Sequence, residues 1–281
     1  MEVFANAKIN LSLDVLGVRE DGYHEVRMLM QSIGLADRIT LDPIPSGIML
    51  HTNRSYLPCD ARNLAYRAAE LFLKETNTSS GVKMNIIKKI PVSAGLAGGS
   101  TDAAAVLVGL NQLFGTKLSR RRLCELGGTL GSDIPFCILG GTALATGRGE
   151  QIHRLPPLPK VYLVLVKPPI SISTPKIYTA LDQQEIACHP DTDALIEKIK
   201  ARDVSGLAQE MVNVLEPVCE TFEPRISELR EKLLSCGAIG ARMSGSGPTV
   251  FGIFETYEQA ARAADAFRGR GDEVIVTSTR R

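Results

Sequence analysis

The sequence predicts an α+β protein of two domains, and three observations support this prediction. The chain has 281 residues, about twice the length of a usual domain. Near its middle, residues 155–159 read Leu-Pro-Pro-Leu-Pro, a stiff segment that we interpret as a linker between domains at 1–154 and 160–281. After this linker, the predicted elements follow the order β-α-β-β-α-β with extra helices inserted early, which is the split ferredoxin-like pattern.

Composition and charge exclude several classes of protein. The chain is 44% hydrophobic and 22% charged, which is typical of a soluble globular protein. Its net charge of +1 gives no reason to expect nucleic acid or an anionic membrane as a partner. None of the six cysteines forms a Cys-x-x-Cys pair, which favours reduced thiols over zinc or disulfides. We find no signal peptide and no apolar run near the roughly 18 residues of a membrane span, so we expect a cytoplasmic protein.

The first strand is the clearest element of the N-terminal half. From Ala5 to Val15 apolar residues occupy the odd positions, and polar residues, Lys8 and Asn10 among them, occupy the even positions. This period of two predicts a strand with one buried and one polar face, and the polar face is most simply solvated. Further strands are predicted at 26–33, 38–42, 47–52, 82–90 and 141–147. Helices are predicted at 61–75 with Asp60 as cap, at 101–114, at 119–130 and, shorter, near Asp133.

The C-terminal half begins with an apolar strand at 161–166. Helices are predicted at 174–181, 191–201, 203–215 and 224–235, and two strands flank a turn at 244–248. A capping box, Thr256 to Gln259, begins a helix at 257–268, and a last strand is predicted at 273–278.

Residues 91–102, Pro-Val-Ser-Ala-Gly-Leu-Ala-Gly-Gly-Ser-Thr-Asp, join an apolar strand to a helix. Glycines permit positive φ and close backbone approach, so consecutive N–H groups can point at one anion, and a helix start adds free donors. Ser100 and Thr101 offer hydroxyls to phosphate oxygens or a metal. The segment favours a phosphate-binding loop, with a sterically required tight turn as the alternative. The P-loop, dinucleotide-binding and protein-kinase signatures are absent.

Three further segments each allow a functional and a simpler structural interpretation. The loop 243–249, Met-Ser-Gly-Ser-Gly-Pro-Thr, either covers a phosphate or makes a hairpin. Asp133, within the segment 131–136, is either a helix cap or a general base with a tuned pKa. The loop 19–24, with Tyr23 and His24, either is a plain turn or stacks on a nucleobase. The residues alone leave these alternatives open.

Taken together, these segments resemble the GHMP kinases, a family of small-molecule ATP-dependent kinases. The resemblance extends over nearly the whole chain, through Ala-Lys-Ile-Asn-Leu at 7–11, the loop at 91–105 and the segment 243–254. Asp-Gly-Tyr-His at 21–24, Gly-Ser-Asp-Ile-Pro-Phe at 131–136 and Thr-Pro-Lys-Ile-Tyr at 174–178 resemble the branch that acts on a cytidine diphosphate-linked methylerythritol. Asn6 replaces the usual proline and Ala97 replaces a glycine, and we expect both departures to be harmless.

The resemblance implies the two-domain GHMP kinase fold. An N-terminal ribosomal-protein-S5-like βαβ domain would bind the nucleotide and carry catalysis, and a C-terminal ferredoxin-like domain would complete the substrate site. The implied activity is an ATP-dependent transferase reaction on an alcohol, the 2-hydroxyl of that substrate, in non-mevalonate isoprenoid and terpenoid biosynthesis. A homoserine or mevalonate type of GHMP kinase is the alternative. ATP and Mg²⁺ are the implied cofactors, without a dedicated protein metal site, and the partner is a small molecule rather than nucleic acid or membrane.

The resemblance also implies roles for individual residues. Asp133 would accept the proton of the substrate hydroxyl, with Lys8 beside it. The substrate would contact Asn10, Tyr23, His24, Thr174 and Tyr178. The nucleotide would contact Asn63 and Lys88 on its adenosine side and the loop residues Pro91, Val92, Ser93, Ala94, Gly95, Leu96, Ala97, Gly98, Gly99, Ser100 and Thr101.

Overall fold

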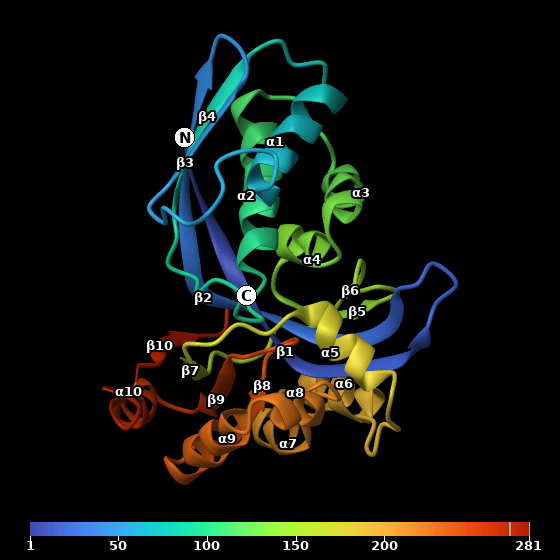
Figure 1. Cartoon of the computed structure of the whole chain (residues 1–281), viewed down its shortest axis with the longest axis vertical. Coiled ribbons are helices and arrows are strands. Elements are labelled where there is room, and N and C mark those ends of the chain that lie inside the picture. Colours follow the sequence, from blue (N-terminus) through green and yellow to red (C-terminus); the bar gives the residue numbers. More distant parts are fainter. Residues whose placement is uncertain (270, 281) are drawn as a thin grey trace.

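The computed structural model describes residues 1–269 and 271–280, and it contains two sheets, one in each half of the chain (Figure 1). In the N-terminal sheet the long strands β1 (Glu2–Val18) and β2 (His24–Ile44) pair antiparallel. The other edge of β2 pairs with β4 (Gly81–Ile87) and, further along, with β5 (Thr142–Thr146). The outer strands are β3 (Ile48–Thr52), parallel to β4, and β6 (Gln151–Arg154), antiparallel to β5. The strands predicted at 26–33 and 38–42 are therefore parts of one strand, and β6 was not predicted.

Four helices accompany this sheet: α1 (Leu64–Glu75), α2 (Gly98–Leu113), α3 (Arg120–Leu130) and α4 (Ile134–Leu139) (Figure 1). Helix α1 begins three residues later than predicted, because its N-cap is Asn63, whose side chain accepts from the N–H of Ala65 at 2.9 Å. Asp60 pairs with Arg62 instead. Helix α2 begins at Gly98 rather than 101, so the glycine-rich segment supplies its first turn. A Cβ at Gly109 would lie 2.4 Å from Leu41, which shows how closely α2 approaches the sheet.

The C-terminal sheet has the strand order β10-β7-β9-β8, all antiparallel, which confirms the ferredoxin-like prediction. Its strands are β7 (Tyr162–Lys167), β8 (Gly240–Met243), β9 (Val250–Phe254) and β10 (Glu273–Ser278). Helices α9 (Arg225–Ser235) and α10 (Tyr257–Asp265) complete the repeat, and the capping box at Thr256 is present. The inserted helices are α5 (Thr174–Leu181), α6 (Thr192–Ala201), α7 (Val204–Glu210) and α8 (Glu216–Phe222). The helix predicted at 203–215 ends at 210, and α8 was not predicted.

The two halves share one hydrophobic core. Leu13 and Met28 of the N-terminal sheet belong to the same buried cluster as Val164 and Phe254 of the C-terminal sheet. The backbone of Leu13 also exchanges hydrogen bonds with residues 212 and 214, at 2.9 and 3.0 Å. The separation at 155–159 into two domains stays a prediction, since packing is continuous across it.

This shared core changes the environment of β1. Its even-numbered side chains from Lys8 to Asp14, which we expected to be solvated, are buried, with Lys8 4% and Asn10 1% exposed, and Asn6 is half-buried. That expectation was wrong because the second half of the chain covers the polar face of the strand. No helix in the described part of the chain is long and apolar enough to span a membrane.

Candidate active site

The phosphate-loop candidate, residues 91–97, has an alternating backbone. Ser93, Gly95 and Ala97 have φ of 52°, 73° and 57°, while the residues between them do not have positive φ. Such alternation curves successive N–H groups toward one concave side, which is a recognised anion-binding arrangement. Ala97 occupies the conformation that costs an L-residue about 1–2 kcal/mol, so its replacement of a glycine is not neutral for the backbone.

The polar groups of this loop are used unequally. The carbonyls at its C-terminal end are occupied: Gly95 O accepts from the Lys8 ammonium at 3.2 Å and from the Ser244 hydroxyl at 3.0 Å, and Leu96 O accepts from the Lys8 N–H at 3.3 Å. In contrast, no hydrogen bond among the described residues uses the backbone N–H groups of residues 92–100. Ala97 is the N-cap of α2 and provides no side-chain cap. The loop therefore presents a row of free donors at the positive end of a helix, as an anion site requires.

Lys8 and Asp133 meet beside this loop. The Lys8 ammonium donates to Asn10 Oδ1 at 2.5 Å and lies 3.9 Å from Asp133 Oδ2. The side chain of Lys8 is 5% exposed, while that of Asp133 is 32% exposed. Residues from β1 and from the start of α4 thus place an amine and an accessible carboxylate at one point.

The local interpretation of Asp133 as a helix cap does not hold. It occupies the N-cap position of α4, but its side chain makes no capping hydrogen bond. Burial raises the pKa of the Tyr178 phenol, and the negative charge of Asp133 raises that pKa further. The carboxylate therefore lies beside the Lys8 ammonium and makes no capping hydrogen bond to its own helix.

The second glycine loop, at 244–248, is both a hairpin and a wall of the site. The N–H of Ser244 donates to Thr249 O at 2.9 Å, which closes the turn, while the Ser244 hydroxyl reaches Gly95 O. A Cβ at Gly95 would lie 2.1 Å from Ser244 O, so only glycine permits this contact. Asn213 donates to Gly245 O at 2.8 Å and holds the loop in place.

The residues expected at the cytidine end gather only in part. The rings of His24 and Tyr178 are 4.6 Å apart, and His24 Nε2 lies 2.7 Å from Asp182 Oδ1. The Thr174 hydroxyl lies 2.6 Å from that of Ser246, in the second loop. Tyr23 is 55% exposed and lies under the Arg148 guanidinium, so it is not stacked with the other two rings.

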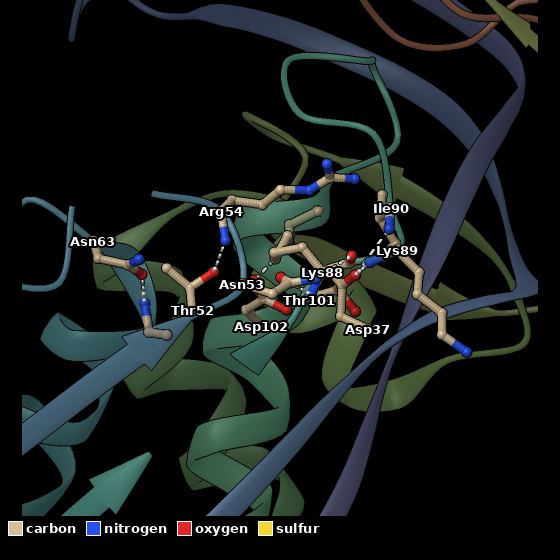
Figure 2. Close-up of polar contacts among 12 residues, drawn as sticks. Asp37, Thr52, Asn53, Arg54, Asn63, Lys88, Lys89, Ile90, Thr101 and Asp102 are labelled. Atoms are coloured by element: carbon tan, nitrogen blue, oxygen red, sulfur yellow. Dashed lines mark hydrogen bonds and ion pairs between the residues drawn. The ribbon is translucent and has the colours of Figure 1, made fainter. Parts of the chain in front are cut away.

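The two residues expected on the adenosine side have their side chains already engaged (Figure 2). Asn63 caps α1 and donates to Pro58 O at 2.9 Å. Lys88 is 6% exposed; its ammonium pairs with Asp37, lies 2.6 Å from Asp102 Oδ2 and donates to Gly98 O at 3.2 Å. Of the loop hydroxyls, that of Thr101 donates to Asn6 O at 2.6 Å.

Sequence reasoning missed three residues at this site: Asp37, Asp102 and Ser244. Asp37 and Asp102 are 0% and 5% exposed, and burial raises the pKa of Asp102 even though the adjacent Lys88 charge lowers it. Asp102 is the last residue of the glycine-rich segment 91–102, so the sequence could have pointed to it. No sequence pattern marks Asp37 as a residue of the site, because only the fold brings β2 next to the loop.

The described residues contain no cluster of three His, Cys, Asp or Glu side chains that would hold a metal ion. Ser100 lies next to the turn at Gly131, where a Cβ would be 3.9 Å from the Ser100 hydroxyl. A hydroxyl and one accessible carboxylate are hard oxygen donors, and Mg²⁺ binds to few such protein ligands when phosphate oxygens and water supply the rest. The residues present are compatible with a nucleotide-borne Mg²⁺.

A loop with free N–H groups beside a lysine and a carboxylate is the arrangement expected of a phosphoryl-transfer site. The family model for the GHMP kinases N terminal domain matches residues 63–141, and that for the GHMP kinases C terminal matches residues 195–273. The chain belongs to the GHMP kinase family, and its fold is the two-domain fold of that family.

Its relatives identify the branch of the family. A 4-diphosphocytidyl-2-C-methyl-D-erythritol kinase of Clostridium botulinum (strain Eklund 17B / Type B) is 47% identical over 99% of this chain and 100% of its own length. The enzyme of that name from Listeria monocytogenes serotype 4b (strain CLIP80459) is 49% identical over 98% of this chain and 94% of its own. A crystal structure of 4-(cytidine 5'-diphospho)-2C-methyl-D-erythritol kinase matches 99% of both chains with a TM-score of 0.85 and 38% identity. A homoserine kinase from Cytophaga hutchinsonii ATCC 33406 has a TM-score of 0.80 but 22% identity, which shows the shared fold alone.

Proposed function

We propose that this chain transfers the γ-phosphoryl group of ATP to the 2-hydroxyl of 4-diphosphocytidyl-2-C-methyl-D-erythritol. The observation that carries the proposal is the meeting of Lys8 and Asp133, 3.9 Å apart, at the loop whose N–H groups are free. The full-length relatives that carry the name of this kinase, two of them at 47% and 49% identity, support the choice of acceptor.

In the proposed reaction the substrate oxygen bonds to the γ-phosphorus of ATP. The bond from that phosphorus to the β–γ bridging oxygen breaks, and ADP leaves with the electron pair. The hydroxyl proton passes to the Asp133 carboxylate. Phosphoryl transfer depends mainly on positioning and on stabilising charge at the transferring oxygens, which the free N–H groups of residues 92–100 supply.

Lys8 has two tasks in this scheme. Its positive charge, 3.9 Å from Asp133 Oδ2, attracts the carboxylate and holds it beside the substrate oxygen. The same charge stabilises negative charge that develops on the substrate oxygen. Asn10 Oδ1 accepts from the Lys8 ammonium at 2.5 Å and so orients it. This contact places Asn10 beside Lys8, where we assign the substrate hydroxyl.

The cytidine end of the substrate is assigned to the pocket around His24 and Tyr178. Their rings supply a stacking surface, and the nitrogen of His24 that does not face Asp182 is available to a base edge. Tyr23 joins this pocket only if its ring moves from beneath Arg148. Thr174 supports the pocket through its contact with Ser246. Asn63 and Lys88 are assigned to the support of the nucleotide site, since their side chains are already engaged.

A Mg²⁺ ion carried by ATP would neutralise part of the charge of the phosphate groups. Among the residues of this chain, Ser100 has the hydroxyl to hold it, because the Thr101 hydroxyl is donated to Asn6 and is buried.

The test is an incubation of the protein with ATP, Mg²⁺ and one candidate alcohol at a time, followed for ADP release. We expect turnover with 4-diphosphocytidyl-2-C-methyl-D-erythritol and none above background with homoserine or mevalonate. CDP should compete with the alcohol, because the pocket is assigned to cytidine. Turnover with homoserine or mevalonate, without protection by CDP, would contradict the proposed acceptor.

A further inference from the structure

A buried charged cluster lies beneath the phosphate loop and is not used by the proposed chemistry (Figure 2). It consists of Asp37 from β2, Lys88 directly after the end of β4, and Asp102 from α2. All three side chains are at most 6% exposed. Removing charges from water is unfavourable, and apolar residues of similar size commonly stabilise a protein at least as well, so stability alone is a weak reason for such a cluster.

The cluster joins the two ends of the loop. On the strand side, Asp37 Oδ1 accepts from the N–H groups of Lys89 and Ile90, at 2.5 and 2.8 Å. On the helix side, the Lys88 ammonium donates to Gly98 O and to Asp102 Oδ2, at 3.2 and 2.6 Å. Lys88 also pairs with Asp37, so residues 91–97 are held between two anchors that one ammonium connects.

The loop needs such anchors. Ser93 and Ala97 both have positive φ without being glycine, and such conformations persist only where the surroundings impose them. Its middle is held by Lys8 and Ser244 at Gly95, which leaves the two ends to the buried cluster. These contacts use the carbonyl oxygens of Gly95 and Gly98 and the N–H groups of Lys89 and Ile90, and they leave the N–H groups of residues 92–100 free.

We propose that Asp37, Lys88 and Asp102 are positioning residues that set the spacing of the loop's two ends and so hold its N–H groups in the geometry that binds the phosphates of a nucleotide. They do not touch the nucleotide themselves. The inference rests on the proposed function only in assigning a nucleoside triphosphate to the loop; the acceptor alcohol does not enter it.

The test compares Asp102→Leu with Asp102→Asn. The two side chains are of similar size, but only the amide oxygen of asparagine can accept from Lys88, and neither variant changes the Lys88–Asp37 pair. The first readout is the dissociation constant of a non-hydrolysable ATP analogue with Mg²⁺, and the second is that of CDP, both by calorimetry. CDP reports the pocket around His24 and Tyr178, which this cluster does not contact.

We expect Asp102→Leu to weaken binding of the analogue by about 10–100-fold, since misplacing binding groups by about 1 Å has effects of this size. Asp102→Asn should stay within about threefold of the wild type, and CDP affinity should change less than about twofold in both variants. In turnover assays KM for ATP should rise in the leucine variant more than kcat falls. Leu229→Ala, a core truncation in α9, is the control for lost stability and should leave both affinities unchanged below its melting temperature.

If Asp102→Leu does not fold, Asp37→Asn replaces it. The asparagine oxygen can still accept from the two N–H groups, but its amide faces the Lys88 ammonium and breaks that pair. Unchanged analogue affinity in folded Asp102→Leu or in Asp37→Asn would overturn the positioning role. An equal loss of CDP and analogue affinity in either of these two variants would overturn it as well. Failure of the acceptor assay with intact analogue binding would instead count against the proposed function and leave this inference standing. A wild-type chain that does not bind the analogue would refute both.

Discussion

Lys8 and Lys88 flank the same loop, and their surroundings differ in one decisive respect. The Lys88 ammonium has two carboxylates and a carbonyl around it, whereas Lys8 has one amide oxygen, one carbonyl and a carboxylate 3.9 Å away. The acids differ as well: Asp37 and Asp102 are buried, while the side chain of Asp133 is 32% exposed. A charged group whose partners are all in place holds structure, and a charged pair that is incompletely satisfied and open to the pocket is free to act on a ligand.

The largest effect is expected at Asp133. Asp133→Asn should reduce turnover by about 10²–10⁴-fold, because the amide cannot accept the hydroxyl proton. Substrate KM and thermal stability should change little, since this side chain makes no capping hydrogen bond. Steady-state kinetics with both substrates and a denaturant curve test this together. Near-normal turnover would remove Asp133 from the role of base.

Lys88→Met tests the buried cluster, and we expect it to reduce the stability of the protein. It leaves Asp37 and Asp102 buried without their cation, and such a loss typically destabilises a protein by about 3–5 kcal/mol. Chemical denaturation of the variant and the wild type measures the difference. A loss below about 1 kcal/mol would mean that the Lys88 ammonium does not hold the buried cluster together.

Lys8→Met is the matched change at the catalytic lysine. We expect a loss of turnover of about 10²–10³-fold, from the missing stabilisation of charge on the substrate oxygen. Its loss of stability should be smaller than that of Lys88→Met, since no buried carboxylate pair depends on Lys8. The comparison fails if the two variants lose stability and turnover in the same proportion.

The smallest effect is expected at Ala97, in the loop that both lysines hold. Ala97→Gly relieves a positive φ but makes the unfolded chain more flexible, so the net gain should be about 0.5–1 kcal/mol. Ala94, whose φ is not positive, is the control: Ala94→Gly should lose about 0.5–1 kcal/mol. Melting curves of both variants provide the measurement, and a gain at both positions would show that strain at 97 is not the cause.

Most of the elements were predictable because their signals are local. The capping box at Thr256, the helix at 174–181 and the strand at 273–278 were predicted with the observed bounds or nearly so, since side-chain period and capping residues act within a few positions. Errors occurred where two local signals competed, as for Asp60 and Asn63 before α1. The single long β2 was divided because its middle, from Gly34 to Ala36, is exposed or half-buried and interrupts the apolar pattern.

The candidate site was predictable residue by residue only through the family resemblance. Lys8 and Asp133 each had a simple local explanation, a solvated strand face and a helix cap, and both explanations are wrong in the folded chain. Asn63 and Lys88 were expected to contact the nucleotide, whereas their side chains are engaged in capping and in the buried cluster.

By itself, the sequence determined most strands, most helices, the ferredoxin-like order and the glycine loop, because each depends on the conformational preferences of neighbouring residues. Only the tertiary structure decided that the polar face of β1 is buried and that Asp37 lies beside the glycine loop. It also decided that the carbonyls of residues 95–98 are engaged while the N–H groups of residues 92–100 are free. These features depend on contacts between residues far apart in the chain, and no local pattern records which distant group will satisfy a given charge or carbonyl.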